Sequence, residues 1–142
     1  KDPVMIEKID QIVDSVKARV KDNFEAYGIT DFFLDFKVYG KNGVMGLFPD
    51  ADSRTAHELC IVIEAVADTQ ERADTICGFA RSTMLHFGYE GRISTAGNLA
   101  FPFSPSDCKV GEVYEFNIYH LMKVNNPSEY FPVEYIQFTN GN

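Results

Sequence analysis

Tryptophan is absent from this chain, and basic residues are scarce: 13 Lys and Arg stand against 21 Asp and Glu, which gives a formal net charge of -8 over 142 residues. A surface of this sign repels nucleic acids and anionic membranes, because both carry fixed negative charge. No apolar run approaches the roughly 20 residues that a membrane-spanning helix needs. We therefore expect neither a nucleic-acid partner nor a membrane partner.

Metal-binding motifs are also missing. The cysteines, Cys60, Cys77 and Cys108, lie far apart, so the chain has no CxxC pair. The histidines form no HxH, HxxxH or HExxH pattern, whereas a metal site needs three or four converging ligands. The sequence predicts no metal site and no cofactor. Scattered thiols in odd number are typical of a reducing compartment, which favours a cytoplasmic location.

No motif announces a catalytic nucleophile. The chain has no GxSxG elbow and no glycine-rich phosphate loop. Cys60 and Cys77 fall in apolar segments, where a thiol is unreactive. The sequence assigns no catalytic residue, and whether the protein is an enzyme stays open.

The chain does contain clear helical periodicity. Asp2 and Pro3 form a predicted helix start, and Gly28 is the predicted stop. Between them, one apolar stripe recurs at spacings of three and four residues: Ile6, Ile9, Val13, Val16, Val20 and Phe24. This stripe favours core packing over a seam between helices of different subunits, and both interpretations stay open. A second helix is predicted over residues 68–88, with Asp68 and Glu71 as a capping box.

Strand patterns fill most of the remaining chain. Residues 32–39 alternate with period two, and Asn42-Gly43 predicts a hairpin turn with a return strand at 44–48. Residues 58–67 are apolar on both faces and predict a central strand. Further strands are predicted over 112–124 and 132–138. Together these elements predict a single α+β domain over residues 1–142, with a mostly antiparallel sheet of five or six strands and two helices packed on one face.

The segment RISTAGNLAFPFSPSD, residues 92–107, has the composition of a ligand-binding loop. It combines a guanidinium, hydroxyls, an amide, a carboxylate and two phenyl rings, stiffened by Pro102 and Pro105. The simpler interpretation is an edge strand whose prolines block further pairing, and the residues alone favour it. The candidate ligand-binding residues, which include one histidine from the following strand, are Arg92, Ser94, Asn98, Phe101, Phe103, Ser104, Ser106, Asp107 and His120.

The same segment also takes part in a resemblance to a known family. TAGNLAFPFSPSD (95–107) followed by GEVYEFNIYHLMKVNNPSEYF (111–131) resembles the C-terminal part of the acyclic terpene utilisation AtuA-like (DUF1446-type) family. The resemblance covers about the last third of the chain, and the turn NNPSEYF is less acidic than the family pattern. That family is associated with bacterial breakdown of acyclic terpenoids and related carboxylic acids. Because its members are longer, the resemblance implies a C-terminal domain or a separately encoded equivalent, with most substrate chemistry elsewhere.

Two functional hypotheses follow. The first is a non-catalytic accessory domain that packs against a protein partner or forms a homo-oligomer, because 12 Phe and 7 Tyr are more than one small core readily hides. The alternative is a small enzyme or ligand-binding domain for an organic acid or acyl thioester. In that hypothesis Arg92 anchors the anion, Asn98 and Ser104 orient it, and Asp107 or His120 moves a proton. The first hypothesis is favoured.

Overall fold

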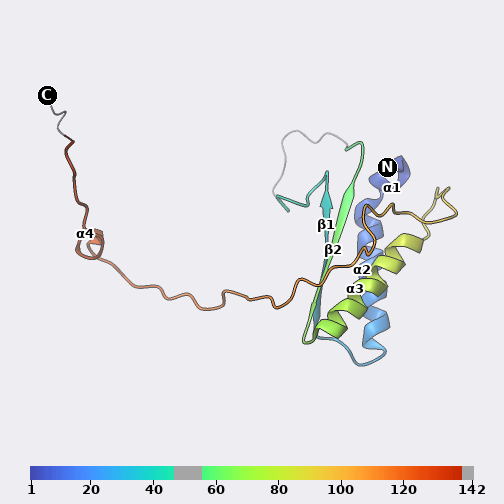
Figure 1. The fold of residues 1–142 in the computed structure, drawn as a ribbon, viewed down its shortest axis with the longest axis horizontal. Coiled ribbons are helices and arrows are strands. Elements are labelled where there is room, and N and C mark those ends of the chain that lie inside the picture. The colour runs from blue at the N-terminus through green and yellow to red at the C-terminus, as the bar shows by residue number, and fades with distance from the viewer. Residues whose placement is uncertain (47–55, 139–142) are drawn as a thin grey trace.

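The computed structural model describes residues 1–46 and 56–138 (Figure 1). Most of the helices and strands lie between Pro3 and His86, and we call residues 1–109, which contain them, the body. Residues 110–138, which we call the arm, run away from the body as an extended chain (Figure 1).

The first predicted helix is confirmed, with one break. Helix α1 spans Pro3–Glu7 and α2 spans Ile9–Glu25, separated by Lys8. Asp2 caps α1 as predicted, since its Oδ1 accepts hydrogen bonds from the N–H groups of Val4 at 2.7 Å and Met5 at 3.2 Å. The bond from Met5 is the largest of the effects that hold the pKa of Asp2 below its usual value. Helix α2 ends shortly before Gly28, whose φ of +74° favours glycine.

Strand β1, Phe32–Tyr39, is confirmed, but its predicted hairpin is wrong. Three successive N–H groups, those of Lys41, Asn42 and Gly43, donate to the carbonyl of Val38 at 3.2, 3.1 and 2.9 Å. This curls the chain into turns up to residue 46, so 44–46 do not return as a strand. Residues 47 and 48 of the predicted return strand lie outside the described residues.

The partner of β1 is β2, Cys60–Ala67, and the two strands are antiparallel. In their register Phe36 lies opposite Ile63 and Val38 lies opposite Ile61. These side chains point to the face that the helices cover. The predicted strand at 58–67 is thus confirmed in position, but its predicted central place in the sheet is wrong, because β1 is the one strand paired with it in the described part of the chain.

The second predicted helix is α3, Gln70–His86. Its N-cap is Thr69, whose hydroxyl accepts from the N–H of Arg72 at 3.3 Å, so the prediction of Asp68 as the cap is wrong. Asp68 instead forms an ion pair with the Arg72 side chain at 2.7 Å. Thr69, in extended conformation, can cap the helix as well as an aspartate can, because its hydroxyl also accepts a hydrogen bond from a backbone N–H. The N-cap therefore lies one residue after the predicted position.

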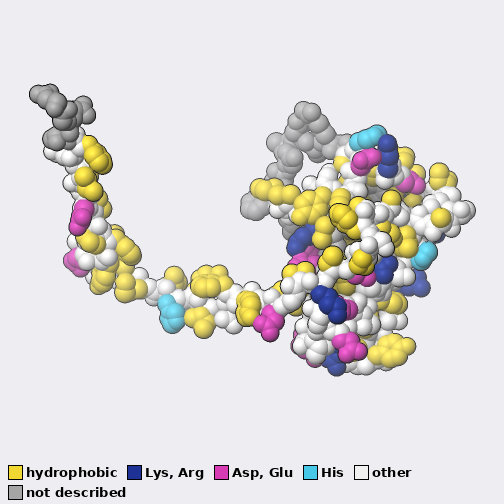
Figure 2. Space-filling model, in the orientation of Figure 1, with side chains coloured by type: hydrophobic (Ala, Val, Ile, Leu, Met, Phe, Trp, Pro, Cys, Tyr) yellow, Lys and Arg dark blue, Asp and Glu magenta, His cyan; other side chains and the backbone are white. Residues whose placement is uncertain are grey.

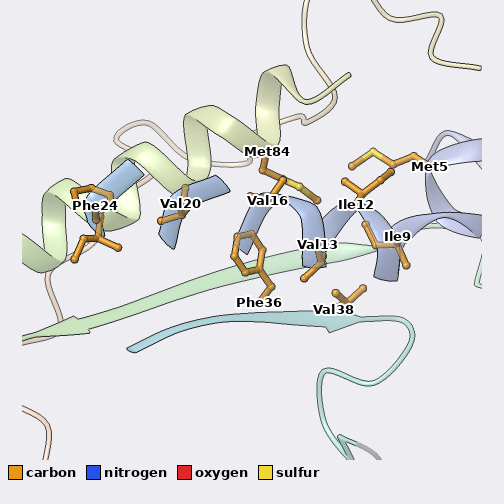
Figure 3. Packing of buried hydrophobic residues seen from close by; sticks show 12 residues of the cluster. Met5, Ile9, Ile12, Val13, Val16, Val20, Phe24, Phe36, Val38 and Met84 are labelled. Carbon is orange, nitrogen blue, oxygen red and sulfur yellow. The ribbon is translucent and has the colours of Figure 1, made fainter. Parts of the chain in front are cut away.

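The core lies between the helices and one face of the sheet (Figure 3). Phe24 of α2 joins the layers, because its ring meets Phe32 of β1 and Phe79 of α3 edge-to-face at centroid distances of 5.8 and 5.6 Å. Helices α2 and α3 lie on one face of the sheet, so the structure is α+β as predicted, but the described residues contain four helices and not two. The buried apolar residues are Met5, Ile9, Ile12, Val13, Val16, Val20, Phe24, Phe36, Val38, Ile76, Ala80 and Met84.

The predicted sheet of five or six strands is wrong, because the described residues form a sheet of two strands. Residues 112–124 and 132–138 are extended but unpaired, and α4, Pro127–Tyr130, is a single helical turn between them. Alternating sequence gives a segment the tendency to be a strand, but a strand forms only beside a neighbour. In the ranges that the structure covers, no helix is long and apolar enough to cross a membrane.

The burial of the core predicts how a substitution there changes the free energy of unfolding, and an exposed valine serves as the control. Val16 is fully buried, whereas Val44 is 79% exposed. We expect Val16→Ala to lower the free energy of unfolding by about 2–3 kcal/mol, since it removes two buried methyl groups and leaves a cavity. Val44→Ala should change it by less than about 0.5 kcal/mol. Urea unfolding followed by circular dichroism measures both, and equal effects would contradict the described core.

Candidate functional site

The segment that follows α3 turns back and closes the end of that helix. The side-chain amide of Asn98 donates to the carbonyls of Met84 at 3.0 Å and Phe87 at 2.8 Å. Its backbone N–H donates to the carbonyl of Leu85 at 2.8 Å. The last carbonyls of a helix have no partner within the helix, so Asn98 supplies what α3 would otherwise lack. Both amide hydrogens of this predicted ligand-binding residue are therefore already engaged.

Arg92 and Ser94 belong to two successive turns of this segment. The hydroxyl of Ser94 bonds to the backbone carbonyl and N–H of Gly97, and the N–H of Arg92 donates to the carbonyl of Tyr89 at 3.1 Å. Gly97 packs so closely that an added Cβ would lie 2.6 Å from a methyl carbon of Leu85. The turn is thus pressed onto α3, which limits the space for a ligand there.

From Asn98 the chain runs along the flank of α3 toward its N-terminal half. Nε of Arg81 lies 2.8 Å from Oδ1 of Asp107, and its guanidinium lies 5.8 Å from the ring centroid of Phe101. Further along, Lys109 pairs with Asp74 at 3.1 Å. Two predicted site residues, Phe101 and Asp107, therefore meet at Arg81. Arg81 was not identified from the sequence, where only its helical spacing from Asp74 hinted at a shared flank.

The other predicted site residues do not join this contact. Phe103, Ser104 and Ser106 are exposed, and the Ser106 hydroxyl bonds to its neighbour Asp107 at 3.2 Å. His120 is exposed on the arm. The nine predicted residues thus lie in three places: at the end of α3, along its flank, and on the arm.

Cys77 lies on the same flank of α3, and its thiol is poorly reactive. Its thiol donates a weak hydrogen bond to the carbonyl of Ile63 at 3.8 Å, which places this flank of α3 over β2. Burial, followed by the negative charge of Asp107, raises the pKa of the Cys77 thiol above its ordinary value. A thiol that stays protonated at neutral pH is a poor nucleophile.

A hollow of about 430 Å³ lies near the start of α3, away from all nine predicted residues. In the described ranges, no group of three or more His, Cys, Asp or Glu side chains could hold a metal ion. The hollow is lined by Phe24, Ile29, Thr69, Glu71, Arg72, Thr75 and Ile76.

The arm is the most unusual surface of the molecule. Apolar side chains follow one another along it without cover (Figure 2). Tyr114, Phe116 and Ile118, at alternate positions in the sequence, are all exposed, and Phe116 is 73% exposed. The other large exposed apolar residues of the arm are Val110, Val113, Tyr119, Leu121, Met122, Tyr130, Phe131, Val133, Tyr135, Ile136 and Phe138. The high aromatic content of the sequence indicated that some apolar side chains would stay exposed, but it did not indicate that they would lie on the arm.

Comparison with known proteins gives no match: no protein-family model, no curated protein and no solved structure is similar to this chain.

The contacts of Asn98 predict a structural role. Asn98→Asp removes both amide donors and places a negative charge beside the carbonyl end of α3, so we expect a loss of about 1–3 kcal/mol of stability at pH 7. Asn117→Asp, the same change on the exposed arm, is the control and should have little effect. Thermal and urea unfolding measure both variants, and an unchanged stability of Asn98→Asp would refute the capping role.

The environment of Cys77 predicts its reactivity. At pH 7 we expect a water-soluble thiol reagent to modify Cys77 at least roughly tenfold more slowly than the exposed Cys108, because both burial and a raised pKa reduce its reactive thiolate. Unfolding in urea should make the two rates similar. Peptide mass spectrometry over time resolves the sites, and fast labelling of Cys77 in the folded protein would contradict this packing.

Proposed function

We propose that this chain is a non-catalytic interaction domain whose binding element is the arm, within an AtuA-like protein linked to terpenoid or organic-acid catabolism. The resemblance of residues 95–107 and 111–131 to that family supports the metabolic context. The three free cysteines support a reducing compartment, and we place the protein in the cytoplasm.

The exposure of the apolar residues on the arm carries this proposal. Proteins that act alone rarely leave a contiguous apolar surface of more than a few hundred Å² in water. Burial of apolar surface is worth about 25 cal/mol per Å², so a run of aromatic and aliphatic side chains gains much by being covered. An extended segment with no internal partner is typical of a chain that becomes ordered on another surface.

The charge of the arm favours a protein as its partner. Its residues include four Glu and one Lys, within a chain of net charge -8. Acidic side chains oppose binding to nucleic acids and to anionic lipid surfaces. A protein surface can cover the apolar side chains and pair with the backbone of the arm.

The alternative, a site for an organic acid in the 92–107 segment, has less support. Asn98 is engaged with the end of α3, Ser94 with Gly97, and Asp107 with Arg81. A ligand would have to replace these contacts, and the cost of breaking them would weaken its binding.

The proposal predicts that the dilute protein binds a hydrophobic fluorescent dye through its arm. We expect the triple variant Tyr114→Ser, Phe116→Ser, Ile118→Ser to lose a measurable share of this fluorescence, because it removes three of the exposed apolar side chains of the arm. Its thermal midpoint should stay unchanged, because these side chains lie outside the core.

A matched control changes the opposite side of the same segment: Val113→Ser, Glu115→Ser, Asn117→Ser. It should retain most of the dye signal. A dilute wild-type protein that binds no dye, while a panel of organic acids raises its thermal midpoint, would overturn the proposal and favour the ligand-binding alternative.

A further inference from the structure

We propose that residues 112–124 of the arm bind as an added strand along the free edge of β2 in a second copy of this chain, and that two copies exchange arms in this way. This inference rests on the proposed function and names its partner.

The free edge of β2 is open to pairing. Within the part of the chain that the structure describes, β2 pairs with β1 on one side only. Its sequence, CIVIEAVA, contains no Lys and no Pro, and Glu64 is its one charged residue. Natural edge strands are usually blunted by Lys, Pro or bulges, because an unprotected edge recruits another strand. The edge of β2 lacks these protections.

The free edge of β1, in contrast, is covered by a charged side chain. Nζ of Lys17 lies 3.1 Å from Oδ1 of Asp35 and 5.8 Å from the ring centroid of Phe36. Adjacent strand residues point to opposite faces, so Lys17 of α2 must reach around the free edge of β1 to touch both. A charged side chain across an edge disfavours pairing there, which leaves β2 as the available edge.

Burial of the sheet shows the same asymmetry. On the helix-facing side, Phe36 and Val38 of β1 are buried, whereas Ile61 and Ile63 of β2, in register with them, are only half-buried. Packed helices lie about 8–10 Å apart, whereas neighbouring strands lie about 4.8 Å apart. A sheet of two strands is therefore too narrow to cover two helices, and the missing cover is beside β2.

Residues 112–124 have the pattern that this edge requires. Tyr114, Phe116 and Ile118 alternate with Glu115 and Asn117. As a strand, the segment would turn Tyr114, Phe116 and Ile118 to the helices and Glu115 and Asn117 to water. It is longer than the 8 residues of β2, so it can pair along the whole edge.

The course of the chain favours a second copy over the chain's own edge. The contacts of Asp107 with Arg81 and of Lys109 with Asp74 fix the start of the arm on the flank of α3. From there the arm leaves the body and does not return (Figure 1). Each copy carries one open edge and one unpaired strand, so a reciprocal exchange between two copies satisfies both and closes the assembly.

Sedimentation equilibrium of the full chain in 0.15 M salt tests this inference with two single substitutions. Phe116→Asp and Asn117→Asp add the same charge one residue apart, on opposite sides of the proposed strand. We expect a wild-type dimer, a dissociation constant at least tenfold higher for Phe116→Asp, and a change of less than about threefold for Asn117→Asp. Circular dichroism checks that both variants keep their helices.

Hydrogen exchange of β2 peptides in the same samples locates the contact. Amides of β2 should be protected in the dimer and should exchange faster in Phe116→Asp, but not in Asn117→Asp. A dimer that Phe116→Asp leaves intact, or in which β2 exchange is unchanged, would overturn the proposed pairing.

A monomeric wild type would overturn the exchange, and dye binding then separates the two proposals. A monomer that binds dye through its arm would leave the interaction domain standing with a different protein as partner. A monomer that binds no dye, with β2 protected, would mean that the arm covers its own body, and both proposals would fail.

Discussion

The width of the sheet is the constraint on which this structure depends. The helices α2 and α3 lie side by side, and Phe24 packs between α3 and the sheet. Beneath them, two antiparallel strands cover the α2 side well and leave the inner face of β2 half-buried. The body leaves apolar surface exposed near β2, and the arm leaves apolar side chains exposed to water. A strand added beside β2 reduces both.

This constraint also explains why the 92–107 segment has its unusual composition. The segment has to cap the end of α3, follow its flank and lead the chain to the start of the arm. Asn98 performs the first task, and Arg81 with Asp107 performs the second. Three polar residues that resemble part of a ligand-binding site, Ser94, Asn98 and Asp107, here make contacts that hold the segment against α3 or within its own turn.

Local patterns predicted the body well. The apolar stripe of α2, the Asp2 cap and the alternation in β1 each depend on a few neighbouring residues, and each is found in the structure. The hairpin at Asn42-Gly43 failed because three bonds to the Val38 carbonyl curl the chain before it can return. The sheet of five or six strands failed for a different reason. Residues 112–124 carry a strand pattern, but alternation does not say which chain provides the neighbour.

The candidate site was less predictable than the fold. Arg81, which meets Asp107 and Phe101, belongs to a helix whose sequence gives no sign of these distant partners. His120 was predicted to lie on the strand that follows the 92–107 segment and to act with it. In the described residues that strand is unpaired, and His120 is exposed on the arm, away from the segment (Figure 1).

The proposed function requires that another chain covers the arm. Amide hydrogen exchange of residues 112–124, measured in the full chain at high and at low protein concentration, tests it most directly. We expect slow exchange in the concentrated sample and fast exchange after dilution, because protection depends on association. Slow exchange at both concentrations, in a protein that sediments as a monomer throughout, would contradict it, since the arm would then be a strand of its own body.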